Sequence, residues 1–441
     1  MQPPELTGSM RSVSTNDSQD VSVGRVVLAS FIGTTIEWYD FFIYGTAAAL
    51  VFNRLFFPGF DDLTGTMFAY ATFAIGFFAR PVGGILFGHF GDRLGRKTML
   101  VTTLTIMGVA TFLIGVLPTY ETAGILAPIL LVTLRCVQGL GVGGEWGGAV
   151  LMAVEHGHRS KRGLYGSWVQ AGVPVGLLMA TAVFAIFSSL PEEQFVTWGW
   201  RVPFLLGIVL LGVGMFIRLR IMESPIFANA KAKQPAPYLP VMEVLRKHPK
   251  NVLLAMGARF SENASFYIFS IWVISYATET LHLPKNTVLT GIWLGAAVQF
   301  FAIPSFGLLS DRWGRRPIYL GGAVFIMAFA FPFFWLVNTQ VNYLVWSAII
   351  LGLIGHSAMY GPQAAFFSEL FGTNVRYTGA SLGYQVASPL AGGLAPLIAT
   401  QLLVIGHGDP SWVAVYLIVT GIITVLAVYF TGETYRSNIE N

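Results

Sequence analysis

Residues 88–97 read GHFGDRLGRK, and residues 307–316 repeat the pattern as GLLSDRWGRR. The two copies lie 219 positions apart in a chain of 441 residues, which indicates that one unit has been written twice. Each copy follows an apolar run and leads into another, so each is expected to be a short charged hinge between two apolar helices. The repeat therefore predicts two equivalent helical halves.

The composition places these helices in a membrane. Hydrophobic residues make up 54% of the chain and charged residues only 11%, and the mean hydropathy is +0.64. Soluble domains carry roughly 25% charged residues, so this chain lacks the polar surface that water requires. Its apolar runs approach the roughly 20 residues that span a bilayer. They show no apolar–polar alternation, which favours helices over a β-barrel and predicts an all-α integral membrane protein.

The hydropathy pattern predicts about twelve transmembrane spans, six in each half. The first six cover 25–52, 64–90, 98–117, 123–153, 163–188 and 199–220. The last six cover 252–279, 287–310, 317–337, 343–367, 377–403 and 411–431. A duplicated bundle of this size, with charged hinges, is typical of solute transporters.

These spans divide the chain into two pseudo-symmetric six-helix halves, 25–220 and 252–431. The segment 221–251 is rich in Lys, Pro and Ala and is expected to be a cytoplasmic linker between them. Residues 1–24 are polar and lack an apolar core, so we expect a disordered cytoplasmic tail and no cleavable signal peptide. Residues 432–441 are expected to form a second cytoplasmic tail.

Basic residues lie mostly on one side of the predicted spans. The loops on that side carry Arg93, Arg96, Lys97, Arg159, Lys161, Arg162, Arg312, Arg315 and Arg316. The opposite loops carry only Arg54 and Lys285. Because positively charged loops stay in the cytoplasm, both hinges and both termini are expected there. The formal net charge of +4 is then explained by anchoring beside the lipid bilayer, and nucleic acid is not expected as a partner.

Glu37 and Asp40 are the ionisable residues of the first span. Because the two residues are three positions apart on a helix, their carboxyl groups share one face. Two carboxylates in a low-dielectric site resist joint ionisation, so at least one is expected to bind a proton and to serve in proton coupling. The alternative is that Asp40 forms a fixed ion pair and never titrates.

The fourth span supplies a positive charge at Arg135, followed by Gln138 and the glycine-rich run 139–144. Arginine stays protonated, so Arg135 needs a partner, and the carboxylates of the first span are its natural candidates. Competition for that partner would couple protonation to solute binding, whereas a static salt bridge would be purely structural. The run GLGVGG lacks the preceding strand of a dinucleotide fingerprint, and its spacing favours close helix packing.

The seventh span carries Arg259, Glu262 and Asn263, followed by Tyr267. The offset of 219 places Arg259 opposite Asp40, so one half presents a base where the other presents an acid. The planar guanidinium of Arg259 can donate to two oxygens at once, which makes it the leading candidate for binding a substrate carboxylate. An internal pair with Glu262 is the alternative.

Polar groups in other spans complete the candidate solute site. His356 in the tenth span serves either as a neutral hydrogen-bonding group or as a proton relay. The polar groups of the fifth and eleventh spans either contact solute or pack against a neighbouring helix. The candidate substrate-binding residues are Arg259, Glu262, Asn263, Gln138, Gln170, Tyr267, His356, Gln363, Tyr384 and Gln385.

The two hinges are candidate gates. Their acidic residues can accept from arginines or cap a neighbouring helix and so close the cytoplasmic side, or the basic residues merely hold the loops inside. The gating candidates are Asp92, Arg93, Arg96, Asp311, Arg312 and Arg315. The sequence contains no metal-ligand spacing, catalytic triad order or phosphate-binding loop. We therefore expect no metal, no cofactor and no enzymatic activity.

Two signatures carry a family resemblance. The hinge pattern G-x-x-x-D-R-x-G-R-[KR], and LxxxRxxQGxGxG around Arg135, resemble signatures of the major facilitator superfamily. The strings IEWYDFFIYG, WGWRVPFLLG and ELFGTNVRYTGASLGYQ are similar to its metabolite:proton symporter family, over residues 25–430. The resemblance implies the major facilitator fold, a bacterial cytoplasmic membrane and a monomer.

The resemblance also implies a symporter that uses the proton motive force to import a small organic anion. Shikimate, or a similar hydroxylated cyclic monocarboxylate, is the leading expectation for that anion. The alternatives are a symporter for α-ketoglutarate or another dicarboxylate, a compatible-solute symporter for proline or betaine, and an exporter or antiporter.

Overall fold

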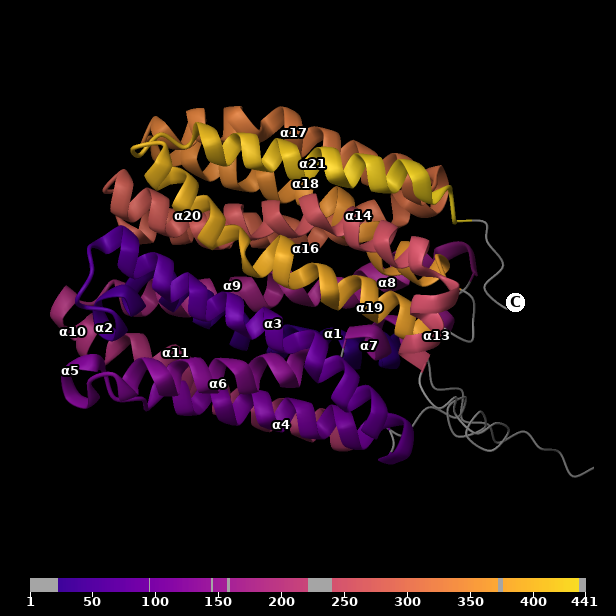
Figure 1. Ribbon diagram of the computed structural model, residues 1–441, viewed down its shortest axis with the longest axis horizontal. Helices are drawn as coiled ribbons and strands as arrows, with labels where there is room; N and C mark the ends of the chain where they lie inside the picture. Colours follow the sequence, from indigo (N-terminus) through magenta and orange to yellow (C-terminus); the bar gives the residue numbers. More distant parts are fainter. Residues whose placement is uncertain are drawn as a thin grey trace, which may run out of the picture.

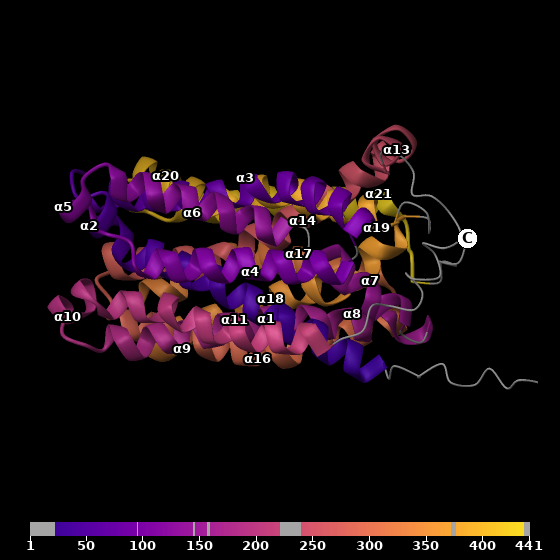
Figure 2. The same cartoon turned by 90° about the horizontal axis from the view of Figure 1, so that it is seen from below.

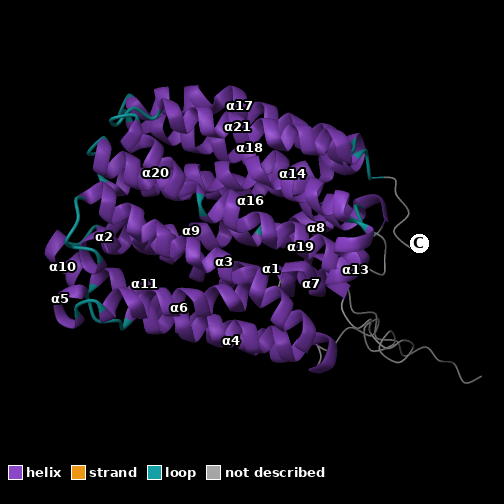
Figure 3. Cartoon of the chain, in the orientation of Figure 1, coloured by secondary structure: helices purple, strands orange, loops and turns teal. Residues whose placement is uncertain are grey.

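The computed structural model describes residues 23–94, 96–143, 146–156, 159–220, 240–371 and 376–435. Within these ranges the chain is helical with short connecting turns and contains no strand (Figure 3). Nine helical stretches of this described part are long and apolar enough to cross a membrane. Three further rods, at 23–56, 96–115 and 249–280, complete the set expected from the sequence. The all-α membrane architecture is confirmed.

The helices of each half follow the predicted spans closely. The first half comprises α1 (Val23–Ala47), α2 (Asn53–Phe56), α3 (Asp62–Leu94), α4 (Arg96–Gly115), α5 (Tyr120–Ala123), α6 (Leu126–Gly143), α7 (Trp146–His156), α8 (Arg162–Gln170), α9 (Gly172–Ser188), α10 (Glu192–Thr197) and α11 (Val202–Arg220). The second half comprises α13 (Pro240–Lys247), α14 (Pro249–Tyr267), α15 (Val273–Ser275), α16 (Lys285–Trp313), α17 (Arg315–Asn338), α18 (Asn342–Glu369), α19 (Arg376–Ser388), α20 (Ala395–Ile405) and α21 (Ser411–Thr431).

The two halves lie side by side with their helices roughly parallel. In Figure 1 the helices of the second half lie largely above those of the first. The halves meet where α9 packs along α16 and where α3 packs along α19 and α20. The offset of 219 relates α3 to α16 and α9 to α20, so the interface itself repeats. The sequence duplication therefore sets the contact between the halves as well as each half.

The end of α3, the beginning of α4 and the turn between α16 and α17 lie at one end of the bundle, which we call the hinge end. Short α13 lies at this end beside α19, together with the beginning of α1 and the end of α21 (Figure 2). We call the opposite end, with α2, α5 and α10, the far end. Residues 221–251 were expected to be a linker, but α13 forms inside this segment. Its Val244 is fully buried and anchors the helix to the bundle.

Helix irregularities also repeat between the halves. A π-helical turn, Ala48–Phe52, interrupts the first rod, and a second, Ile268–Trp272, interrupts the seventh at almost the same place in the repeat. The break between α8 and α9 at Ala171 corresponds to a third π-helical turn, Pro389–Gly393, between α19 and α20. Such turns often mark functional sites inside helices. Here they flank the polar clusters described next.

Candidate functional site

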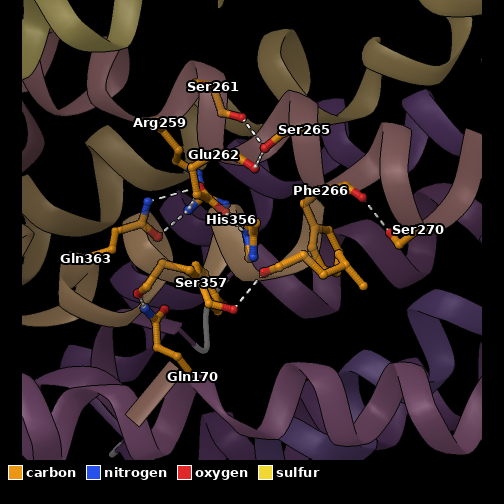
Figure 4. Close-up of polar contacts among 12 residues, drawn as sticks. Gln170, Arg259, Ser261, Glu262, Ser265, Phe266, Ser270, His356, Ser357 and Gln363 are labelled. Atoms are coloured by element: carbon orange, nitrogen blue, oxygen red, sulfur yellow. Dashed lines mark hydrogen bonds and ion pairs between the residues drawn. The ribbon is translucent and has the colours of Figure 1, made fainter. Parts of the chain in front are cut away.

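Arg259 on α14 lies at the centre of a buried polar cluster in the second half (Figure 4). Its NH1 donates to Gln363 Oε1 at 3.1 Å and lies 3.4 Å from Glu262 Oε2. Its Nε donates to Ser388 Oγ at 3.3 Å, and its Cζ lies 3.1 Å from the ring centroid of Tyr384. Arg259 therefore forms the internal pair with Glu262 that the sequence allowed as the alternative to substrate binding.

Glu262 is held by two side chains of α18. Its Oε1 lies 3.1 Å from His356 Nε2, and its Oε2 accepts from Gln363 Nε2 at 3.0 Å. The amide nitrogen of Gln299 on α16 lies 2.8 Å from His356 Nδ1. Because that amide donates, Nδ1 accepts, and the imidazole proton sits on Nε2 and faces Glu262. Gln299 is a functional candidate that sequence reasoning missed.

Asp40 lies at the end of a second series of buried polar side chains, in the first half. Arg135 NH1 donates to Gln138 Oε1 at 3.1 Å, and Gln138 Nε2 donates to Thr111 Oγ1 at 2.7 Å. Thr111 lies beside the Asp40 carboxyl group, and both face Gly207 on α11. No ion pair joins Arg135 directly to Asp40 within the described ranges. The expected pairing is therefore indirect in this conformation and runs through an amide and a hydroxyl group.

Asp40 itself is 1% exposed, and its Oδ1 has no hydrogen-bond partner among the described residues. An ionised carboxylate in this position would be costly, because burial removes its hydration and leaves Oδ1 without a partner among the described residues. The site therefore favours a carboxyl group that holds a proton. The fixed ion pair that would have kept Asp40 from titrating is not formed here.

Arg80 on α3 is a second buried arginine of this half and was not singled out from the sequence. Its Cζ lies 4.4 Å from the ring centroid of Phe41 and 4.3 Å from that of Phe77. Arg135 stacks on Phe41 at 4.5 Å as well. The available signal was a lone arginine in the apolar run 64–90, which the expectation of carboxylate–arginine pairs between the first and fourth spans overlooked.

The remaining solute candidates divide into two groups. Tyr267 packs edge to face on Phe77 across the contact between the halves, and Asn263 lies 3.1 Å from Arg259 Nε when its amide oxygen faces the guanidinium. Gln170 donates to the backbone carbonyl of Tyr360, and Gln385 donates to that of Gly143 at 3.2 Å. Both glutamines bind backbone of the opposite half, so helix contact is the better interpretation of their role.

At the hinge end, Asp311 joins the two halves. Its carboxylate accepts from the backbone N–H groups of Gly163 (2.8 Å) and Leu164 (2.9 Å) at the start of α8, and it pairs with Arg315 at 2.7 Å. Arg315 in turn binds Glu369 through two hydrogen bonds of 3.2 and 3.1 Å. We call these five residues the hinge latch. Gly314 allows this turn, because its φ of 103° is disfavoured for other residues.

The other gating candidates do not belong to the hinge latch. Arg312 is exposed and makes no hydrogen bond or ion pair with the described part of the chain, so its gating role stays a prediction. The side chains of Asp92, Arg93 and Arg96 lie outside the described residues, and their gating role stays a prediction.

Replacing Asp311 with asparagine is expected to open the hinge end. The variant loses the ion pair with Arg315, and the N–H groups of Gly163 and Leu164 no longer have a charged acceptor. Hydrogen bonds to charged groups contribute about 1.5–3 kcal/mol, so the open conformation should gain about tenfold to a hundredfold. The measurement is the rate at which a water-soluble maleimide labels a cysteine placed at fully buried Ser167, in a Cys136→Ser background. Equal labelling rates in Asp311→Asn and the control Arg312→Gln would contradict the latch.

The far end is closed by a separate set of contacts between the halves. Thr66 donates to Glu279 at 2.9 Å, and Asn53 Nδ2 lies 3.4 Å from the same carboxylate. Glu192 pairs across the contact with Lys285 and, within its own half, with Arg54, each at 3.0 Å. All of these residues except Thr66 line a cavity of about 440 Å³. The buried clusters thus lie between two closures, as in an occluded conformation of a carrier.

Repeated helical halves around buried charges, closed at both ends, define a multi-pass membrane transporter. The chain belongs to the major facilitator superfamily, whose match covers residues 30–396. It is 43% identical over 417 residues to the shikimate transporter of Escherichia coli K12, covering 94% of this chain and 95% of that protein. It is 33% identical over 428 residues to a proline/betaine transporter of Salmonella typhimurium, covering 94% and 84%.

Solved structures share the fold. The xylose transporter of Escherichia coli, in a partially occluded inward-open conformation, aligns with a TM-score of 0.71 at 18% identity, over 94% of this chain and 99% of that one. The family assignment made from the hinge motifs is confirmed. Because the relatives are transporters, the expectation that this chain is not an enzyme is also confirmed.

Proposed function

We propose that the protein imports a small organic acid together with protons across a bacterial cytoplasmic membrane. The observation that carries the proposal is the environment of Asp40, a buried carboxyl group whose Oδ1 has no hydrogen-bond partner and which pairs with no arginine in the part of the chain that the structure describes. A carboxyl group of this kind is suited to alternate between a protonated and an ionised form as access changes sides. The proton motive force would supply the energy, and the proposal includes no cofactor.

The substrate class follows from charge and from the relatives. Arg80, Arg135 and Arg259, which are buried in the membrane helices near the contact between the halves, support a site for an anion. The identity to a shikimate transporter supports a hydroxylated cyclic monocarboxylate, with shikimate itself the first compound to test. Dicarboxylates and the zwitterions proline and betaine remain competing substrates, the latter because of the proline/betaine relative.

We place the polar contacts for the solute in the second-half cluster. Glu262, His356, Gln363, Asn263 and Gln299 offer a fixed set of donors and acceptors that suit substrate hydroxyl groups. Glu262 and Asn263 lie on α14, which leads into the π-helical turn Ile268–Trp272, and a small shift of the helix axis there would change their distance from α16 and α18.

The proposed cycle starts with the far end open and Asp40 protonated. The anion binds, the far end closes, and the hinge latch releases so that the halves rock about the site. The hinge end faces the cytoplasm in this proposal, consistent with the basic residues of its loops. The higher internal pH removes the proton, and the solute leaves. A monomer surrounded by lipid contains every element of this cycle.

A screen of candidate solutes tests the substrate class. Purified protein is melted in detergent with shikimate, α-ketoglutarate, citrate, proline or betaine, and each stabilising compound is then offered to proteoliposomes with an alkaline interior. We expect shikimate to raise Tm and to accumulate. Accumulation of betaine or a dicarboxylate without shikimate uptake would reassign the substrate. Absence of pH-driven accumulation for every compound would contradict proton-coupled import of an organic acid.

A further inference from the structure

Arg80 and Arg135, two buried arginines of the first half, use their hydrogen-bonding groups incompletely. Arg135 donates through NH1 to Gln138, but its Nε and NH2 have no partner among the described residues. Arg80 Nε is likewise without a partner in the described ranges. Both side chains are at most 2% exposed. Arg259, by contrast, donates through Nε and NH1 to protein groups. Buried charged donors without partners are costly, so they indicate a place where a ligand supplies the acceptors.

Aromatic rings hold both guanidinium groups in place. Phe41 contacts both, with Arg80 Cζ at 4.4 Å and Arg135 Cζ at 4.5 Å from its ring centroid. Arg135 also stacks on Tyr44 at 4.2 Å. A ring face stabilises a cation through its quadrupole and occupies the flat side of the guanidinium. The N–H groups around the edge of each guanidinium stay available for the two oxygens of a carboxylate.

Tyr267 of the second half places this arginine pair at the contact between the halves. Its ring packs edge to face on Phe41 at 6.0 Å and on Phe77 at 5.3 Å. Arg80, Arg135 and Arg259 all lie within its electrostatic environment. A solute beside Tyr267 would therefore meet the unpartnered arginines on one side and the second-half hydroxyl-binding cluster on the other.

The charge balance fits one carboxylate. Each described arginine of this region has an acid near it, since Arg259 pairs with Glu262, Arg80 has Glu37 in its environment, and Arg135 reaches Asp40 through Gln138 and Thr111. Protonation of Asp40 removes one negative charge from this set. A single carboxylate then restores neutrality, whereas a dicarboxylate would leave a buried excess of negative charge.

We propose that Arg80 and Arg135, stacked on Phe41, form the seat for the substrate carboxylate, and that the seat accepts a monocarboxylate when Asp40 is protonated. The inference rests on the proposed import of an organic acid and assigns the carboxylate to the first half. Arg259 acts through Glu262 and the second-half cluster, on the hydroxylated part of the solute.

The test compares Arg80→Gln, Arg80→Lys and Arg135→Gln in proteoliposomes with an alkaline interior, using shikimate as the transported probe and its uncharged methyl ester as a competitor. Loss of one charge-assisted contact should raise KM for shikimate about tenfold to a hundredfold. Inhibition by the ester should change little, because the ester carries no carboxylate. Arg80→Lys keeps the cation over the rings but loses the planar fork, so it should fold and show a smaller rise in KM.

Arg201 offers a matched control. It stacks on Trp200 at 4.5 Å and donates to the carbonyl groups of Gly115 and Leu117 at 3.0 and 2.6 Å. Arg201→Gln should lower Tm without raising KM. Wild-type KM in all three seat variants, or an equal loss of affinity for the ester, would overturn the seat while leaving the proposed function intact. Wild-type protein that accumulates no organic acid would overturn both.

Discussion

Asp40→Asn is expected to abolish uphill accumulation driven by a pH gradient while leaving solute exchange intact. Asparagine is close to the size of the protonated acid, so the variant should mimic the loaded state and still rock between its two conformations. It cannot release a proton at the cytoplasmic side, and uptake should stop at equilibration with the medium. The measurement is accumulation of labelled solute in proteoliposomes, followed by counterflow in the same vesicles.

Glu37→Gln separates the two carboxyl groups of the first span. If Asp40 carries the coupled proton, Glu37→Gln should retain some pH-driven uptake. Asp61→Asn is a matched control, because Asp61 is exposed outside the spans and caps α3 through the N–H of Thr64, a role that asparagine keeps. Hydrogen bonds from Thr64 lower the pKa of Asp61, so it stays ionised at neutral pH. Wild-type accumulation in Asp40→Asn and Glu37→Gln alike would exclude the carboxylate mechanism.

Arg259→Gln should reduce transport by about a hundredfold or more and should also destabilise the protein. Glu262 would remain buried without its cation, and breaking a buried pair from one side costs about 3–5 kcal/mol. The measurements are Tm in detergent and initial uptake at saturating solute. Glu262→Gln alone should also destabilise the protein, because Arg259 would stay buried without its anion and the amide NH2 group would face one of the two donors that the carboxylate now accepts from.

The double variant Arg259→Gln/Glu262→Gln distinguishes structure from function. With both charges removed, most of the lost stability should return, because no uncompensated charge stays buried. Transport should not return, because the cluster can no longer bind solute hydroxyl groups in the same geometry. Recovery of both stability and uptake would show that the pair is only structural.

The fold was largely predictable because it depends on long apolar segments and on a repeat, both of which are visible in the sequence. Apolar runs set the spans, and the repeated hinge set the two-fold plan. The same repeat singled out Asp311, which caps α8 and binds Arg315 and whose gating role stays a prediction. Helix α13 escaped prediction because it is short, and among its described side chains Val244 alone is fully buried.

The site was less predictable because span membership does not fix which way a side chain points or which half supplies its partner. Gln170 and Gln385 look like solute contacts in sequence but bind backbone across the interface. Gln299 and Thr111 look ordinary in apolar helices but complete the two polar chains. Arg80 lacked an obvious acidic neighbour in the sequence, and its aromatic support appears only in three dimensions.

Proton movement during solute entry tests the central claim most directly. Weakly buffered proteoliposomes are prepared without a pH gradient, shikimate is added outside, and external pH is followed with an electrode while labelled uptake is counted. We predict external alkalinisation in step with uptake, at one proton for each monocarboxylate, and its loss in Asp40→Asn. Shikimate entry without a change in external pH, or with acidification, would contradict proton-coupled import.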